Sequence, residues 1–192
     1  MDESTLDSLG WDNWFEEQLE NLLDQGQSVA RVVTVDRDQL LLLDEKGSCR
    51  AKLSGKYLRD SGTASQRPCV GDWVCIETTE PGQFALVHKI FERRTCLRRK
   101  AAGDSVEYQM IAANVDFVII VQSCHFDFNL KRLERYLVMV KDGGATPVIL
   151  LTKTDLVNPL ALADQIEKIR NTGITEPVVT CLLYTSPSPR DS

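Results

Sequence analysis

Hydrophobic and polar positions follow different rules in successive parts of the chain. Residues 11–23 place apolar side chains at helical spacing, with Trp11, Phe15, Leu19 and Leu22 forming one stripe opposite acidic residues. The pattern predicts an amphipathic helix. The apolar stripe of such a helix must pack against another apolar surface. We favour packing on its own domain over binding to a partner protein.

Residues 28–94 consist of short runs rich in β-branched and large apolar residues, separated by polar turns. The runs are 28–36, 39–44, 48–55, 72–80 and 84–94. Five short strands predict an OB-fold, because closing them into a barrel removes exposed edges. The polar loop 59–69 resembles loops that hold oligonucleotides in this fold. Phe84 and Phe91 are better explained as barrel core than as base-stacking side chains.

Residues 113–180 change to an α/β pattern. Continuous apolar runs at 117–121, 147–151 and 177–179 predict buried parallel strands. A helical stripe over 130–140 separates the first two, and Asn158 with Pro159 is typical of the start of a second helix. The order β-α-β-α-β indicates a doubly wound sheet.

Composition narrows the class of protein. The 192 residues include no apolar run near the length of about 20 that a membrane helix needs. The N-terminus lacks the basic and apolar regions of a secretory signal, so we expect a cytoplasmic protein without membrane contact. The six cysteines form no CxxC pair and the two histidines have no neighbouring ligand, so no metal site is expected.

Charge is unevenly distributed. Residues 1–27 hold eight acidic side chains and no Lys or Arg, whereas residues 91–100 are strongly basic. By itself such a basic run is more often a solvated surface, and contact with RNA phosphates is the alternative. The candidate RNA-binding residues are Arg93, Arg94, Arg98, Arg99 and Lys100.

The segment TKTD (152–155) directly follows the apolar strand 147–151. Ligands bind at the carboxyl ends of parallel strands. Asp155 could accept two hydrogen bonds from guanine, Lys153 could lay its alkyl stem along the base, and Thr152 could bridge neighbouring loops. By itself the tetrapeptide is more often an ordinary turn. The KxDG motif of covalent nucleotidyltransferases is excluded, because Leu156 replaces its glycine.

Several motifs in a fixed order make the interpretation specific. The chain resembles the ribosome small subunit-dependent GTPase A family, which are bacterial circularly permuted GTPases with an N-terminal OB-fold. The shared motifs are LGW (9–11), VGDWV (70–74), ERRTCLRRKAAG (92–103), QMIAANVDFVIIV (109–121), FNLKRLERYL (128–137) and PVILLTKTDL (147–156). In this family the guanine motif precedes the phosphate-binding loop.

The resemblance implies a ribosome-assembly GTPase that binds GTP or GDP with Mg²⁺, the small (30S) ribosomal subunit and 16S rRNA. It also implies a zinc-binding C-terminal domain and a monomer. Beside an OB-fold, the resemblance further favours contact of the basic run with rRNA phosphates over a solvated surface. However, the chain contains no GxxxxGK[ST] phosphate loop, and no catalytic residue can be assigned in its sequence. We therefore expect an inactive N-terminal fragment that does not bind GTP tightly. The alternative is an OB-fold RNA-binding module without nucleotide hydrolysis.

The tail departs from this pattern. Reverse translation of CLLYTSPSPRD (181–191) resembles a transposase-type sequencing adapter read in frame. The expected fold is thus an all-β OB-fold barrel followed by a partial, circularly permuted P-loop GTPase-like α/β domain. The expected division is an acidic segment at 1–27, the barrel at 28–94, part of the G domain at 95–180, and an artefact at 181–192.

Overall fold

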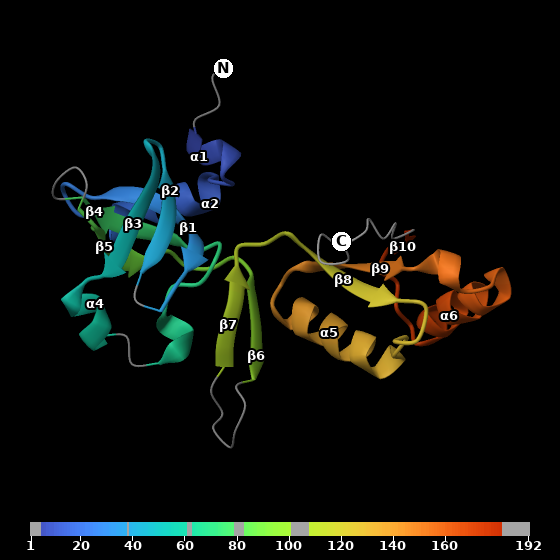
Figure 1. Ribbon diagram of the computed structural model, residues 1–192. Coiled ribbons are helices and arrows are strands. Elements are labelled where there is room, and N and C mark those ends of the chain that lie inside the picture. The colour runs from blue at the N-terminus through green and yellow to red at the C-terminus, as the bar shows by residue number, and fades with distance from the viewer. Residues whose placement is uncertain (1–4, 38, 61–62, 79–82, 101–107, 182–192) are drawn as a thin grey trace, which may run out of the picture. The chain divides into compact units, whose positions relative to one another are not determined.

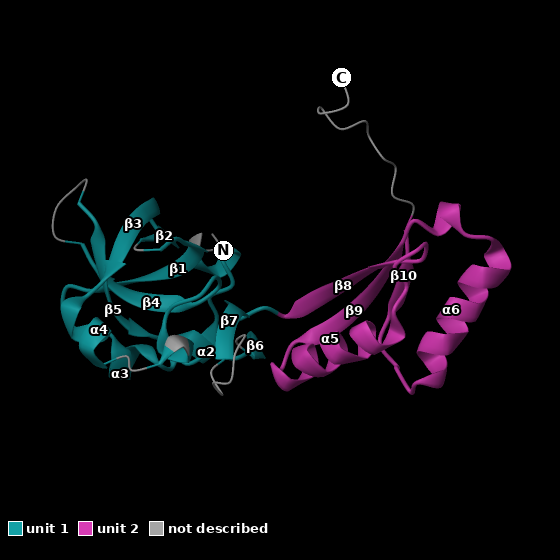
Figure 2. Cartoon of the chain, turned by 60° about the horizontal axis from the view of Figure 1, so that its bottom comes forward, with its two compact units in different colours: residues 1–115 teal, residues 116–192 magenta. Residues whose placement is uncertain are grey.

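A computed structural model describes all residues except 1–4, 38, 61–62, 79–82, 101–107 and 182–192 (Figure 1). The chain divides into two compact units, which are coloured separately in Figure 2. We call Met1–Val115 the barrel unit and Asp116–Ser192 the α/β unit. No helix among the described residues is long and apolar enough to cross a membrane.

A closed five-stranded barrel forms the centre of the first unit, as the sequence predicts. Its strands are β1 (Ser28–Val35), β2 (Leu40–Asp44), β3 (Gly47–Leu53), β4 (Trp73–Glu77) and β5 (Ala85–Ile90). Their order is β1-β2-β3-β5-β4, and only the β3–β5 pair is parallel. Alternate side chains fill the interior, among them Val32, Leu42, Val74, Ile76 and Val87.

The predicted N-terminal helix is instead broken into short turns. The helices are α1 (Thr5–Ser8), α2 (Asn13–Glu16) and α3 (Leu19–Leu22). A tertiary contact explains the break between α2 and α3: the Gln18 side chain accepts from the Glu92 backbone N–H at 2.7 Å, and it also donates to the nearby Trp14 carbonyl at 3.1 Å. Glu92 lies just after the end of β5, so this hydrogen bond ties Gln18 to the barrel unit. It favours a turn at Gln18 over one continuous helix.

The apolar stripe of this segment packs on the barrel, which confirms docking on its own domain. The Trp11 ring lies 4.8 Å from Trp73 and 5.2 Å from Phe91, both edge-on, and Phe15 stacks on Trp11 at 5.4 Å. Phe91 is only 2% exposed, so it is a core residue, as expected. This aromatic cluster joins the acidic segment to the barrel wall.

The region between β3 and β4 is more ordered than the predicted loop 59–69. It contains α4 (Gly55–Asp60) and a 3-10 turn, η1 (Ala64–Gln66). The Ser54 hydroxyl accepts from the Tyr57 backbone N–H at 3.2 Å, which is a normal N-terminal cap for α4.

A two-stranded hairpin extends the barrel unit beyond the fifth strand. Its strands are β6 (Cys96–Lys100) and β7 (Tyr108–Ala113), which pair antiparallel. Gly71 allows this hairpin to approach the barrel closely, since a Cβ at this position would lie 2.0 Å from the Ala113 carbonyl oxygen. The contacts therefore place 95–115 with the barrel. The domain boundary at 94 and 95 stays a prediction.

The α/β unit has the predicted order. It consists of β8 (Phe117–Ser123), α5 (Leu130–Asp142), β9 (Thr146–Thr152), η2 (Thr154–Leu156), α6 (Pro159–Asn171) and β10 (Val178–Thr180). The strands are parallel in the order β10-β9-β8. Asn158 caps α6 by accepting from the Ala161 N–H at 2.8 Å, as expected, and Asn129 caps α5 in the same way.

One face of this sheet is strongly exposed. Side chains alternate along β8, and the register with β9 and β10 puts Phe117, Ile119, Val121 and Val179 on the same face. They are 67%, 60%, 60% and 47% exposed, respectively. The opposite face is covered, with Ile149, Leu151 and Leu133 buried.

This difference predicts how the two units behave alone. Residues 1–115 should unfold cooperatively in urea, because the barrel closes on itself and the aromatic cluster covers one wall. Residues 116–180 should not, because a half-covered apolar sheet cannot offset its ordering entropy. Denaturation followed by circular dichroism checks this on separately expressed segments. A monomeric, cooperatively unfolding 116–180 would contradict the expectation.

Candidate functional site

The guanine motif lies at the carboxyl end of β9. Thr152 is the last residue of the strand and is 4% exposed, whereas Lys153 and Asp155 are exposed. The Thr152 hydroxyl donates to the Gln122 carbonyl of β8 at 3.5 Å. The threonine thus bridges two strands, whereas the bridge between neighbouring loops stays a prediction.

Lys153 adopts a left-handed backbone conformation, with φ 57° and ψ 38°. A residue with a Cβ pays about 1–2 kcal/mol for this conformation. The turn carries the chain from β9 into η2, so that Lys153 and Asp155 both follow the strand end. Strained backbone of this kind is concentrated at functional sites.

The loop after β8 borders the motif. The Cys124 N–H donates to the Thr152 carbonyl at 2.9 Å, and the Gln165 side chain donates to the Cys124 carbonyl at 2.8 Å. On the other side, the Cys181 N–H donates to the Leu151 carbonyl at 2.9 Å. The rest of the predicted adapter segment, 182–192, lies outside the described residues.

Sequence reasoning missed an ion pair in this loop. Arg132 donates to both carboxylate oxygens of Asp127, at 3.0 and 2.8 Å, and to its backbone carbonyl at 2.7 Å. The hydrogen bonds from Arg132 lower the pKa of the Asp127 carboxyl, and the Lys153 charge lowers it further. Arg132 lies in the FNLKRLERYL motif (128–137) and Asp127 directly precedes it, but a five-residue spacing matches no helical periodicity that would reveal the pair.

The five basic candidates do not form one surface, because Arg93 is committed to the barrel. Its guanidinium donates to the fully buried Asp72 carboxylate at 2.7 and 2.8 Å. It also donates to the carbonyls of Ser65 and Arg67, each at 2.8 Å. These bonds use most of its N–H groups, which argues against a phosphate contact for Arg93.

Arg94 is paired with the acidic N-terminal segment. It donates to both carboxylate oxygens of Asp12 at 2.6 Å, and its guanidinium carbon lies 5.4 Å from the Phe15 ring centroid. Its hydrogen bonds lower the pKa of the Asp12 carboxyl, against a smaller effect of burial. Arg94 remains exposed.

The other three basic residues are exposed on strand β6. Arg98 lies over the Tyr108 ring, with its guanidinium carbon 4.6 Å from the ring centroid. Arg99 donates to the Gln109 side chain at 3.0 and 3.2 Å. Successive side chains of a strand point to opposite faces, so Arg98 and Lys100 lie on one face of the hairpin and Arg99 lies on the other.

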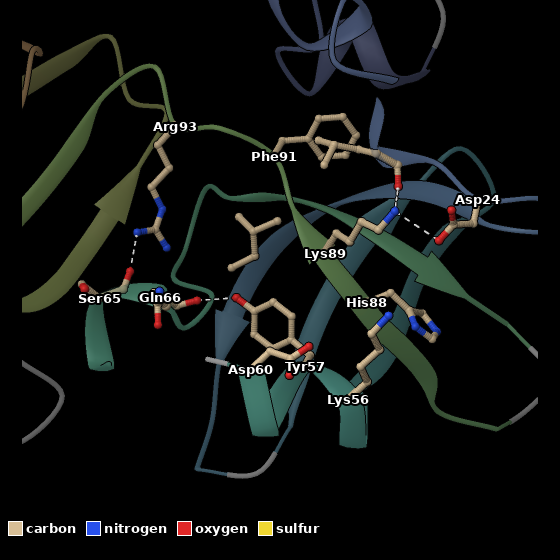
Figure 3. A pocket seen from close by; sticks show the side chains of 12 residues that line it. Asp24, Lys56, Tyr57, Asp60, Ser65, Gln66, His88, Lys89, Phe91 and Arg93 are labelled. Atoms are coloured by element: carbon tan, nitrogen blue, oxygen red, sulfur yellow. Dashed lines mark hydrogen bonds and ion pairs between the residues drawn. The ribbon is translucent and has the colours of Figure 1, made fainter. Parts of the chain in front are cut away.

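A cavity of about 680 Å³ lies on the barrel between α4 and β5 (Figure 3). Lys89 donates to the Leu22 carbonyl at 2.8 Å and pairs with Asp24 at 3.1 Å. Burial raises the pKa of Tyr57 to about 12, and its hydroxyl donates to the Gln66 carbonyl. The positive charges of Lys89 and Arg93 are therefore already paired with Asp24 and Asp72. No predicted guanine-binding residue lines this cavity.

No group of three or more metal-binding side chains occurs in the described part of the chain. The candidate site is the carboxyl edge of β8 and β9, where the guanine motif follows the end of β9. The β6–β7 hairpin is a separate basic surface.

Comparison with known proteins identifies the family. The solved structure described as YloQ, a circularly permuted GTPase, aligns with a TM-score of 0.60 and 23% identity, covering 83% of this chain and 53% of that one. YjeQ from Thermotoga maritima aligns with a TM-score of 0.62 and 21% identity, covering 81% and 52%. Residues 90–183 match the family model described as RsgA GTPase. This chain thus contains a region of the RsgA GTPase family at residues 90–183.

Curated relatives agree with this assignment. The small ribosomal subunit biogenesis GTPase RsgA of Opitutus terrae is 38% identical over 184 residues, covering 92% of this chain and 50% of the relative. RsgA 2 of Listeria monocytogenes is 40% identical over 167 residues, covering 86% and 45%. The resemblance to the RsgA family is confirmed, and the chain spans about half the length of the curated relatives it matches.

Proposed function

We propose that this chain is the N-terminal part of a GTPase that assists assembly of the small ribosomal subunit. The observation that carries the proposal is the position of TKTD, at the carboxyl edge of a β-α-β unit that follows an OB-like barrel. The YloQ neighbour, which is similar to this chain in fold, is described as a circularly permuted GTPase.

In this proposal Asp155 reads the base. Its exposed carboxylate accepts one hydrogen bond from guanine N1–H and one from the 2-amino group, which adenine does not offer together. The Lys153 stem covers the base plane, and Thr152 fixes the strand end through Gln122. Mg²⁺ and the phosphates bind through a loop outside this sequence, which contains no GxxxxGK[ST].

The barrel unit supplies contacts with 16S rRNA. Arg98 and Lys100 form the core of this surface, because they are exposed on the same face of β6, and Arg99 adds an exposed cation on the other face of the hairpin. Arg94 contributes only after it leaves Asp12, and Arg93 stays with Asp72. An exposed Tyr108 beneath Arg98 adds an aromatic face of the kind on which unpaired bases stack.

The salt dependence of RNA binding tests this surface. If the three residues contact about three phosphates, the log–log slope should be about −2 to −3. The double variant Arg98→Glu/Arg99→Glu should flatten it by more than half. The control Arg135→Glu/Arg170→Glu changes the net charge equally on two exposed helical positions and should keep the slope. Equal slopes in all three proteins would assign β6 to a solvated surface.

We also propose a monomeric cytoplasmic protein with a zinc-binding domain beyond this sequence. The second candidate function is an RNA-binding module without hydrolysis, which the missing phosphate motif favours for the chain taken alone. Hydrolysis of GTP by the longer protein separates the two. GTP but not ATP should be cleaved, faster when purified small subunits are added. Absence of GTP cleavage with intact subunits would leave only the RNA-binding module.

A further inference from the structure

The helix that follows the guanine motif is tied back to the start of that motif by hydrogen bonds. From Thr152 the chain passes through Lys153 and η2 into α6. On α6, the Gln165 side-chain amide donates to the Cys124 carbonyl at 2.8 Å. The Cys124 N–H in turn donates to the Thr152 carbonyl at 2.9 Å. The guanine motif therefore belongs to a closed path of backbone, helix and two hydrogen bonds.

The second of these bonds acts on the backbone of the motif itself. The Thr152 carbonyl belongs to the peptide group that joins Thr152 to Lys153, so a donor on this oxygen fixes the plane of that group. The left-handed conformation of Lys153, with φ 57° and ψ 38°, starts from this plane. Such a conformation persists only where its surroundings hold it. The position of Cys124 therefore helps to determine where Lys153 and Asp155 lie.

The surroundings of these bonds make them count. Cys124 is fully buried and Thr152 is 4% exposed, so water does not compete for their backbone groups. Removing the Gln165 donor would leave the carbonyl of a buried residue without this partner, which is the costly way to lose a hydrogen bond.

Packing alone does not explain a glutamine at this position. Gln165 is half-buried on α6, and its Oε1 atom is buried with no hydrogen-bond partner in the described part of the chain. A buried oxygen of this kind costs free energy that an apolar side chain would avoid. What the amide provides, and an apolar side chain lacks, is the N–H donor to Cys124.

We propose that Gln165 is a positioning residue for guanine recognition. Through Cys124 it holds the peptide group between Thr152 and Lys153, and with it the turn that presents Lys153 and Asp155 to the base. This inference rests on the proposed function of TKTD. The ligand class is a guanine nucleotide, and Gln165 acts on it only through Cys124.

The affinities of the longer protein for GDP and ADP test the proposal. Gln165→Met keeps the length of the side chain and removes its donor, so GDP affinity should fall about five- to tenfold. ADP affinity should stay unchanged, because adenine lacks the two donors that Asp155 reads. In the Asp155→Asn background the same substitution should add less than about a twofold loss, since base reading is already impaired there. Glu167→Met is the control, because it changes an exposed residue of the same helix and should leave both affinities as in the wild type.

The other results would overturn the inference or its premise. Unchanged GDP affinity in Gln165→Met, with a clear loss in Asp155→Asn, would overturn the positioning role and leave the guanine site standing. Equal losses for GDP and ADP, or losses that multiply in the double variant, would also overturn it, because Gln165 would then only stabilise the α/β unit. If Asp155→Asn binds GDP as the wild type does, the proposed guanine site itself fails.

Discussion

Asp155→Asn should change the base preference of the longer protein from guanine to xanthine. The carboxylate accepts from guanine N1–H and the 2-amino group, whereas an amide offers an NH₂ that pairs with the 2-oxo group of xanthine. Guanine affinity should fall about 10²-fold, because one charge-assisted hydrogen bond is lost and its donor is left unpaired. Xanthosine diphosphate should recover much of that loss.

Two features of the structure make this variant informative. Asp155 is exposed in the short turn η2, and no hydrogen bond in the described part of the chain depends on its side chain, so the isosteric change should leave folding intact. Thr152→Ala should have a smaller effect, because Thr152 bridges to Gln122 without reading the base. Binding of GDP and xanthosine diphosphate to each variant measures the change. Unaltered GDP affinity in Asp155→Asn would show that another group reads guanine.

Arg93→Gln should destabilise the barrel unit by about 3–5 kcal/mol. Asp72 is fully buried and Arg93 only 17% exposed, so the substitution leaves an uncompensated carboxylate in the interior. It also removes the donors of the Ser65 and Arg67 carbonyls. With total stabilities of about 5–15 kcal/mol for whole domains, a loss of this size moves the unfolding midpoint strongly.

The neighbouring arginine provides the control. Arg94 makes an equally short two-point contact with Asp12, but these side chains are 39% and 46% exposed. Arg94→Gln should therefore cost at most about 1 kcal/mol. Urea denaturation of both variants gives the comparison. Similar losses for the two would contradict the structural role assigned to Arg93.

The arginines illustrate how far the sequence predicts the site. Their clustering over 91–100 is visible in the sequence, but contacts with distant residues decide which of them are free to bind RNA. Asp72 belongs to a VGDWV turn, and nothing in that motif shows that its carboxylate points inward to Arg93. Strand β6 was not predicted within the basic run. It forms because residues 108–113 pair with it.

The strands and helices with strong local signals were predicted correctly. Polar turns separate the barrel strands, and Asn158 caps α6 as expected. The prediction of one helix over 11–23 was wrong, because the Gln18 side chain accepts a hydrogen bond from the Glu92 backbone. Helical periodicity does not reveal such a contact with a distant residue. For the same reason the Asp127–Arg132 pair is visible only in the folded structure.

The central claim is that the carboxyl edge of β9 reads guanine. The most direct test compares the dissociation constants of GDP and ADP for the longer protein under the same Mg²⁺ concentration. The two nucleotides share their phosphates and ribose, so the ratio isolates the base. We predict that GDP binds at least about 10²-fold more tightly, from the paired hydrogen bonds to Asp155. Equal affinities for GDP and ADP would contradict the account.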